Sequence, residues 1–201
     1  MYLPDSFRID DPQEIFSIVR QYSFAVLVAE GEHGLEANHL PLIVESEEPL
    51  VIAGHMSRAN TQWRAFDGSR EAIAVFSGPH TFISPTWYDS QPNVPTWNYV
   101  AVHLHGKPVL IEGADETLEH LHKVVAVFDP GLAEAQPQSM APEYLQKMLG
   151  GLVAFRMEVT RVEAKAKLNQ NKMEPDRLAV KDRLSMSGDA ALLEMSRMMR
   201  A

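Results

Sequence analysis

The stretch Phe24-Ala25-Val26-Leu27-Val28-Ala29 is the first of four short apolar runs that decide the fold. The other three span residues 36–44, 50–55 and 72–77, and Gly, Glu or Pro residues separate the runs. Runs of this length, rich in Val, Ile and Phe and bounded by turn residues, are typical of consecutive antiparallel strands. The first half of the chain is therefore predicted to form a β-sheet.

Three further strands are expected later in the chain. Residues 99–105 and 108–112 are predicted to form a hairpin around Gly106-Lys107, and Leu152 to Val162 alternates as one long strand does. About seven short strands with only brief helices between them favour a mainly β fold with peripheral helices. We expect the strands to close into an antiparallel barrel, because closure removes exposed strand edges.

Two helices are predicted in the first two thirds of the chain. The first opens at Asp11-Pro12 and continues to about Tyr22. The second starts at Ala114 or Asp115, runs through Phe128 and ends at Pro130-Gly131.

Two more helical segments are expected in the last third. Apolar spacing predicts a short helix that contains Tyr144, Leu145, Met148 and Leu149. Residues 174–201 read as a helical tail with an apolar stripe, and Asp189 is its expected internal cap. Such a stripe is usual for a core or a dimer contact. We expect residues 1–172 to form the barrel domain and residues 173–201 a helical segment packed on the barrel or on a dimer partner.

Composition excludes several classes of protein. The 201 residues are 45% hydrophobic and 22% charged, as in ordinary globular domains. The absence of cysteine excludes disulfides, thiolate nucleophiles and thiolate metal sites. Residues 1–11 lack the basic and apolar regions of a signal peptide, and no apolar run approaches the roughly 20 residues of a membrane span. We expect a soluble, cytoplasmic protein that does not contact membranes.

The charge is unevenly distributed. The formal net charge is −9, which opposes non-specific binding to the phosphates of DNA. Residues 156–201 hold 10 Lys and Arg against 7 Asp and Glu, a balance of +3, whereas residues 1–155 hold 8 against 20, a balance of −12. The C-terminal segment is therefore the candidate DNA surface, although interspersed signs also fit a solvated helix face.

Rings, prolines and polar side chains are concentrated between Gly78 and Gly106. Trp87 and Trp97 each follow a Pro-Thr pair directly. Rigid segments that carry rings beside amide and imidazole groups suit the binding of a flat heterocyclic ligand. A Pro-stiffened loop that covers one end of a barrel would have the same composition, and composition favours neither interpretation.

A second polar cluster spans Gly54 to Trp63, where a strand is expected to meet a helix. Ser57, Arg58, Asn60 and Thr61 supply the hydroxyl, guanidinium and backbone donors that phosphate groups need at a helix start. A plain N-cap would need only one of these side chains. The cluster therefore favours an anion site.

Three smaller clusters carry weaker signals. Residues 37–42 include a proline inside an apolar strand, which predicts an edge or irregular strand with free backbone groups. Residues 165–172 are basic and polar and fit either a surface loop or a second ligand contact. His103 and His105 share one face of a strand, yet a structural role is expected for them, and no metal site is predicted. No Gly-rich nucleotide loop, nucleophile elbow or zinc helix motif is present.

The order of these clusters resembles the PaiB family of FMN-binding negative transcriptional regulators, in the FMN-binding split β-barrel superfamily with pyridoxamine phosphate oxidases and flavin reductases. The resemblance covers nearly the whole chain. It is carried by residues 1–4 (MYLP), 39–42 (HLPL), 54–63 (GHMSRANTQW), 78–80 (GPH) with 83–85 (ISP), 94–99 (VPTWNY), and 167–168 (KL) with 170–171 (QN). Asn169 and Lys172 depart from the family pattern, where serine and arginine are expected.

The resemblance implies a homodimer of split barrels with FMN bound across the subunit interface. It also implies which residues contact FMN: His39, Leu40, Pro41, His55, Ser57, Arg58, Asn60, Gln62, Trp97, Asn98, Tyr99, Lys167, Gln170 and Asn171. By the same similarity, the Ser57-Arg58 stretch contacts the phosphate and residues 39–41 line the isoalloxazine ring. No catalytic residue is assigned.

Three functions stay open at this point. The family implies transcriptional repression, although the sequence shows no clear helix-turn-helix. Bound FMN would equally supply the chemistry of an oxidoreductase, such as a flavin reductase or an enzyme similar to pyridoxamine phosphate oxidase. An FMN-binding sensor or carrier that acts through protein partners is the third alternative.

Overall fold

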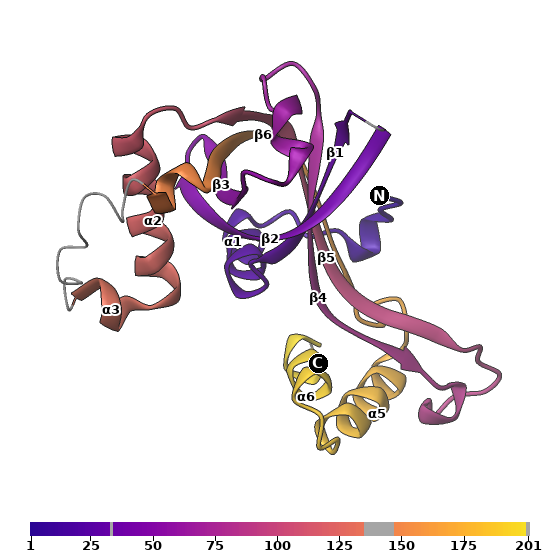
Figure 1. Ribbon diagram of the computed structural model, residues 1–201. Helices are drawn as coiled ribbons and strands as arrows, with labels where there is room; N and C mark the ends of the chain where they lie inside the picture. The colour runs from indigo at the N-terminus through magenta and orange to yellow at the C-terminus, as the bar shows by residue number, and fades with distance from the viewer. Residues whose placement is uncertain (33, 135–146, 200–201) are drawn as a thin grey trace. The chain divides into compact units, whose positions relative to one another are not determined.

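Six strands form a closed barrel in the order β1-β2-β3-β6-β5-β4 (Figure 1). The computed structural model describes residues 1–32, 34–134 and 147–199. The strands are β1 (Phe24–Gly31), β2 (Gly34–Glu47), β3 (Leu50–Ser57), β4 (Ala72–Ile83), β5 (Thr96–Leu110) and β6 (Leu152–Lys167). β1 pairs antiparallel with β2 and β4, and β3 pairs antiparallel with β2 and β6. The expected closed antiparallel barrel is confirmed, with six strands in the described part of the chain.

The predicted hairpin at Gly106-Lys107 is wrong, because β5 runs without a turn from Thr96 to Leu110. Gly106 lies inside this strand, at a close approach to β6. A Cβ atom on Gly106 would lie 2.2 Å from the backbone oxygen of Glu158 and 2.8 Å from Cγ of Met157. Glycine is therefore needed here because the two strands approach closely. In the sequence, a glycine required for this reason looks the same as a glycine required by a turn.

Of the two alternatives expected at Pro41, the edge strand is wrong, whereas the strand is irregular there because its pairing partner changes. β2 lies between β1 and β3 in the barrel, so it is not an edge strand. Pairing of β2 with β1 ends at Phe24↔Pro41, and pairing with β3 begins at Leu42↔Gly54. Pro41 lies at the position where the pairing partner of β2 changes from β1 to β3. Its missing N–H group therefore interrupts neither set of interstrand hydrogen bonds.

The helices lie close to their expected positions. They are α1 (Pro12–Gln21), α2 (Ala114–Phe128), α3 (Pro130–Glu134), α5 (Glu174–Ser185) and α6 (Ala190–Met198), with short 3-10 turns η1 (Asp5–Phe7), η2 (Thr61–Ala65) and η3 (Pro85–Trp87). Asp189 caps α6 as expected, since its carboxylate accepts from the N–H groups of Ala191 and Leu192. Pro130-Gly131 ends α2 but also begins α3, because proline is well suited to the first helical position.

Part of the predicted helix before Gly150 cannot be compared with the structure. Tyr144 and Leu145 lie outside the described residues, whereas residues 147–150 are helical. Among the described residues, no helix has the length and apolar character required to cross a membrane.

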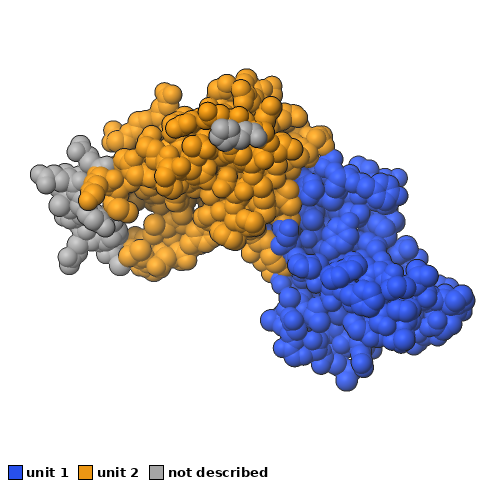
Figure 2. All heavy atoms as spheres, turned by 45° about the vertical axis from the view of Figure 1, so that its right-hand side comes forward, with its two compact units in different colours: residues 1–18, 77–103, 163–201 blue, residues 19–76, 104–162 orange. Residues whose placement is uncertain are grey.

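The chain divides into two compact units (Figure 2). Unit 1 contains residues 1–18, 77–103 and 163–201, and unit 2 contains residues 19–76 and 104–162. The most deeply buried large side chains of unit 2 are Leu27, Leu42, Ile52, Phe76, Leu104, Phe155 and Met157. The apolar stripe of the C-terminal helices is core, because Val180, Leu184, Met195 and Met199 of unit 1 are buried. A boundary at residue 172 stays a prediction.

Candidate functional site

The predicted site residues fall into two groups. Unit 2 holds those on β2, on β3 and in the turn after β3, which are His39, Leu40, Pro41, His55, Ser57, Arg58, Asn60 and Gln62. Unit 1 holds those at the start of β5 and the end of β6, which are Trp97, Asn98, Tyr99, Lys167, Gln170 and Asn171. We describe each group within its own unit.

On β2, the three predicted residues differ in exposure. The His39 ring is exposed and stacks on the exposed ring of Phe24, with centroids 6.0 Å apart and planes at 30°. Leu40 is buried, and Pro41 is half-buried. His39 and Phe24 therefore present a pair of stacked rings to solvent at this end of β2.

Arg58 ties the end of β3 to the start of β6. Its Nε donates to the backbone oxygen of Gly150 at 2.7 Å, and its Nη2 donates to that of Leu152 at 2.9 Å. The guanidinium also lies 5.8 Å from the ring centroid of Trp63. The Nη1 donors make no hydrogen bond within the described part of the chain, so they remain available to an anion.

Arg58 and Trp63 line a pocket of about 430 Å³. Its wall includes the first turn of α2, from Gly113 through Ala114 to Thr117. Apolar side chains and one acidic residue, Glu112, also line it; the apolar ones include Leu110, Ile111, Leu149, Leu152 and Val153. A cavity of this size has room for a small ligand group, whose anionic part would contact Arg58 and lie away from the Glu112 carboxylate.

The neighbouring polar residues are engaged in local structure. Ser57 Oγ accepts from the Ala59 N–H, and Asn60 Oδ1 caps η2 by accepting from the Gln62 N–H. The helix expected here is a single 3-10 turn, which has little dipole to offer an anion.

Gln62 is fully buried and uses both ends of its amide. Nε2 donates to the backbone oxygens of Leu27 and Glu36 at 3.2 and 2.9 Å, and Oε1 accepts from Asn38 Nδ2 at 3.0 Å. Both amide hydrogens are thereby used, so the side chain has no donor left for a phosphate. These bonds connect η2 to β1 and β2.

His55 contacts a histidine that sequence reasoning missed. Its Nδ1 lies 3.2 Å from Nε2 of His120 on α2, and the two rings meet edge to face with centroids 5.4 Å apart. His120 is 1% exposed, and its Nδ1 has no partner among the described residues. Nothing in the sequence connects these two residues, because they are 65 positions apart.

Both histidines are held in their neutral form. Burial lowers the pKa of His55. Burial is also the main cause that lowers the pKa of His120 to about 4, repulsion from His55 acts in the same direction, and the Glu45 carboxylate opposes both. At neutral pH both rings are therefore uncharged, and the hydrogen bond between them joins β3 to α2.

In unit 1, Trp97 begins an exposed aromatic surface. Its ring is 54% exposed and lies near those of His80 and Phe82, with centroids 6.4 and 6.2 Å away. Phe82 is itself 45% exposed. We call His80, Phe82 and Trp97 the Trp97 ledge.

The two residues after Trp97 turn away from solvent. Asn98 is fully buried, and neither its amide nitrogen nor its amide oxygen has a hydrogen-bond partner among the described residues. The Tyr99 ring lies 5.1 Å from the ammonium of the buried Lys165, which also donates to the Tyr2 backbone oxygen. Lys165 is thus held by rings and a carbonyl, as a desolvated cation requires.

The end of β6 closes in a tight turn. Lys167 Nζ donates to Thr96 Oγ1, while Gln170 accepts from the Leu168 N–H and donates to the Ala166 oxygen. Asn169 has φ of 65°, in the left-handed region that asparagine adopts more easily than most residues. This conformation explains why asparagine suits the position, and Asn171 after it is exposed.

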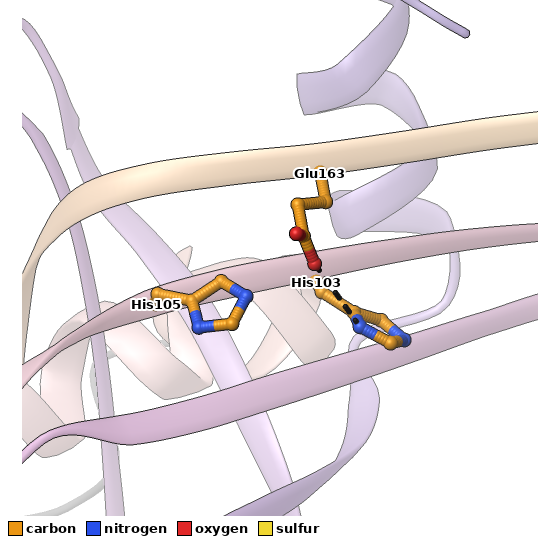
Figure 3. Close-up of side chains that lie close together, drawn as sticks. All are labelled: His103, His105 and Glu163. Atoms are coloured by element: carbon orange, nitrogen blue, oxygen red, sulfur yellow. Dashed lines mark ion pairs between the residues drawn. The ribbon is translucent and has the colours of Figure 1, made fainter. Parts of the chain in front are cut away.

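His103 has an acidic partner that is distant in sequence. Its Nδ1 lies 3.7 Å from Oε2 of Glu163 on β6, an ion pair drawn in Figure 3. In unit 2, Arg161 Nη2 lies 2.9 Å from Nδ1 of His105. Both rings therefore take part in side-chain contacts between strands, and their structural role stays a prediction.

Comparisons with known proteins agree with this fold. The chain matches the family described as "Putative FMN-binding domain" over residues 1–161. It is 34% identical to "Protease synthase and sporulation protein PAI 2" of Bacillus subtilis, over 99% of this chain and 96% of that protein.

Solved structures share the barrel at low sequence identity. The FAD and heme binding protein from Mycobacterium smegmatis has a TM-score of 0.65 at 13% identity, over 86% of this chain and 78% of that one. The flavocytochrome Anf3 from Azotobacter vinelandii has a TM-score of 0.63 at 15% identity, over 78% and 67% of the two chains. These likenesses show a split-barrel flavoprotein fold, and together with the family match they establish that the chain belongs to the FMN-binding domain family, as a PaiB-type member.

Proposed function

We propose that this chain is a homodimeric negative regulator of transcription whose ligand, FMN, lies with its ring on the Trp97 ledge. The exposed Trp97 ring carries this proposal. A tryptophan more than half exposed beside two further rings leaves a large flat apolar surface in water, at a cost that a stacked ligand would remove.

Polar groups beside the ledge fit the edge of a flavin. The Asn98 amide has two unpartnered polar ends, and buried amides of this kind are costly unless a partner arrives. Because Asn98 is fully enclosed, its use by FMN would require the start of β5 to move. Lys167 lies within hydrogen-bond reach of Thr96, directly before Trp97. When bound, FMN would supply redox chemistry, and these side chains would orient its ring.

The phosphate is assigned to Arg58. Its Nη1 donors and the 430 Å³ pocket beside it provide a cation and space, while Nε and Nη2 hold the guanidinium in place. A guanidinium fixed in this way loses little conformational entropy when it binds an anion. In the proposed homodimer, each FMN takes its ring contact from one subunit and its phosphate contact from the other.

The ring assignment is tested by FMN titration of Trp97→Ala, with flavin fluorescence as the readout. Trp87→Ala is a matched control, because Trp87 also follows a Pro-Thr pair but is not part of the ledge. Loss of about 1–3 kcal/mol of stacking predicts a Kd raised roughly ten-fold or more in Trp97→Ala only. Equal Kd values for both variants would rule out the ledge.

The shared site is tested by mixing subunits. Trp97→Ala and Arg58→Ala homodimers each lose both sites, whereas their heterodimer regains one intact site if the two residues act from different subunits. Complete exchange of equal amounts makes about half of the dimers heterodimers, each with one intact site of two, so recovery of about a quarter of the tight FMN sites supports the assignment. No recovery, with dimer exchange verified by mass, contradicts it.

The regulatory role is supported by the family that the sequence resembles and by the local balance of +3 over residues 156–201. Arg183 and Arg197 of the C-terminal helices are exposed. Retardation of duplex DNA from a random-sequence pool, weakened by salt and changed by FMN, supports regulation. An absence of binding, together with bleaching of bound flavin by NADH or NADPH, would instead support the oxidoreductase alternative.

A further inference from the structure

α2 is held on the barrel of unit 2 by contacts of two different kinds. Salt bridges join Lys123 to Glu45 on β2 at 2.8 Å, and Glu116 to Arg156 on β6 at 3.3 Å. The third contact is the hydrogen bond between His120 and His55 on β3. The salt bridges are partly exposed and therefore weak, whereas the contact with His55 is made by a fully buried ring, that of His120.

The His120 ring can be accommodated only when it is uncharged. His120 has one partner, His55, and its second ring nitrogen is buried without any partner among the described residues. In a protonated His120 ring both nitrogens carry a hydrogen, so this buried N–H would belong to a desolvated cation and would have no acceptor. A proton on each ring would place two cations 3.2 Å apart.

The charged groups around the pair do not neutralise such a cation. Lys123 of α2 and Arg156 of β6 are cations, and they pair with the acidic groups nearby, which are Glu45 of β2 and Glu116 and Glu119 of α2. These five side chains and His120 line a common pocket of about 380 Å³. Only Glu45 favours the protonated form of His120, and its carboxylate already accepts from Lys123.

We propose that the His55–His120 pair is a proton-controlled latch that docks α2 on β3 and opens on mild acidification. The first turn of α2 forms part of the wall of the 430 Å³ pocket that Arg58 and Trp63 line. Release of α2 therefore opens this pocket. Protonation of the latch would therefore control how easily an anion reaches Arg58 in this pocket. This holds for any anion that the pocket binds, so the proposal does not depend on FMN being the ligand.

The sign of the effect follows from the direction of the shift. A histidine whose pKa is lowered in the folded protein binds a proton more readily once its helix is released. The docked state of α2 therefore becomes less stable as pH decreases below the ordinary histidine pKa. This loss of stability is complete once the pH reaches the pKa of His120 in the folded protein, which is about 4. The latch therefore opens between about pH 6.5 and pH 4, largely above the range in which ordinary carboxylates titrate.

Hydrogen exchange of the full-length protein, followed by mass spectrometry, tests the latch. Protection of peptides from residues 114–128, corrected for the intrinsic pH dependence of exchange, is compared at pH 7 and pH 5. We expect about a ten-fold loss of protection in the wild type. Peptides from β1 and β2 serve as an internal reference, and their protection should change far less.

Three variants separate the latch from general instability. His120→Phe keeps a ring in place and removes the titration of His120, so most of the pH dependence of α2 protection should disappear over this range. His120→Gln does the same while retaining a hydrogen-bonding group, and it replaces the first variant if that one does not fold. His122→Gln is the matched control, because His122 is exposed on the same helix and its loss should leave the wild-type response intact.

The outcomes decide the proposal. A pH response that disappears in either His120 variant and persists in His122→Gln supports the latch. A wild-type α2 equally protected at pH 7 and pH 5 overturns it, as does an unchanged response in a folded His120 variant.

Discussion

Replacement of Gln62 by alanine should destabilise the protein substantially. The variant loses the two donor bonds to Leu27 and Glu36 and the acceptor bond from Asn38. At about 1 kcal/mol net for each hydrogen bond, the expected loss is about 3 kcal/mol in the free energy of unfolding. For a chain of this size, that loss lowers Tm by roughly 6–12 °C.

Urea denaturation, followed by circular dichroism, measures this loss. Gln91→Ala is the matched control, since Gln91 is exposed and makes a single hydrogen bond to the Pro85 oxygen. The control should lose less than about 1 kcal/mol. A Gln62→Ala protein as stable as the control would refute the assignment of Gln62 as the residue that connects η2 to β1 and β2.

Further predictions concern packing, the ligand and pH. Gly106→Ala should lower stability by about 1–3 kcal/mol in the same denaturation assay, because its Cβ would clash with the Glu158 backbone, whereas Gly150→Ala, with open space around its Cβ, should not. Arg58→Ala should raise the Kd of FMN about ten-fold or more, measured by flavin fluorescence, and an unchanged Kd would exclude the phosphate role. Hydrogen bonds from Ser90 lower the pKa of Asp176, so Asp176 stabilises the fold above the ordinary carboxyl pKa and this contribution is lost as pH falls through the lowered value. Stability of Asp176→Asn should therefore change less than that of the wild type between pH 5 and pH 3, and equal changes would contradict this role.

The sequence predicted the elements whose signals are local. Apolar periodicity located the first residue of five of the six strands to within two residues, although β4 and β6 continue beyond their predicted ends. The cap at Asp189 was located from its position before an apolar run. The hairpin predicted at Gly106 and the edge strand considered at Pro41 were wrong for the same reason. Glycine and proline mark turns and edges, but they also occur where strands approach closely or exchange partners, and only the barrel distinguishes these cases.

The candidate site was less predictable because its contacts are distant in sequence. An anion site needs donors of the kind that Ser57, Asn60 and Gln62 carry, yet these side chains make local contacts in the structure. Ser57 stabilises a turn, Asn60 caps η2, and the buried Gln62 bonds to the backbone of β1 and β2. His120 is a partner of His55 only because α2 packs on β3, which no spacing rule reveals. The composition of residues 78–106 draws attention to Trp97, because a tryptophan among polar residues is unusual in a strand, and its contact with FMN stays a proposal.

The proposed FMN site is tested most directly by one measurement. The purified protein is titrated with FMN, its visible absorption spectrum is recorded, and the mixture is passed through gel filtration. We predict that the flavin bands co-elute with a dimer-sized protein peak, and that the Trp97→Ala protein elutes without them. Failure of the wild-type protein to retain flavin at micromolar FMN would contradict the proposed site.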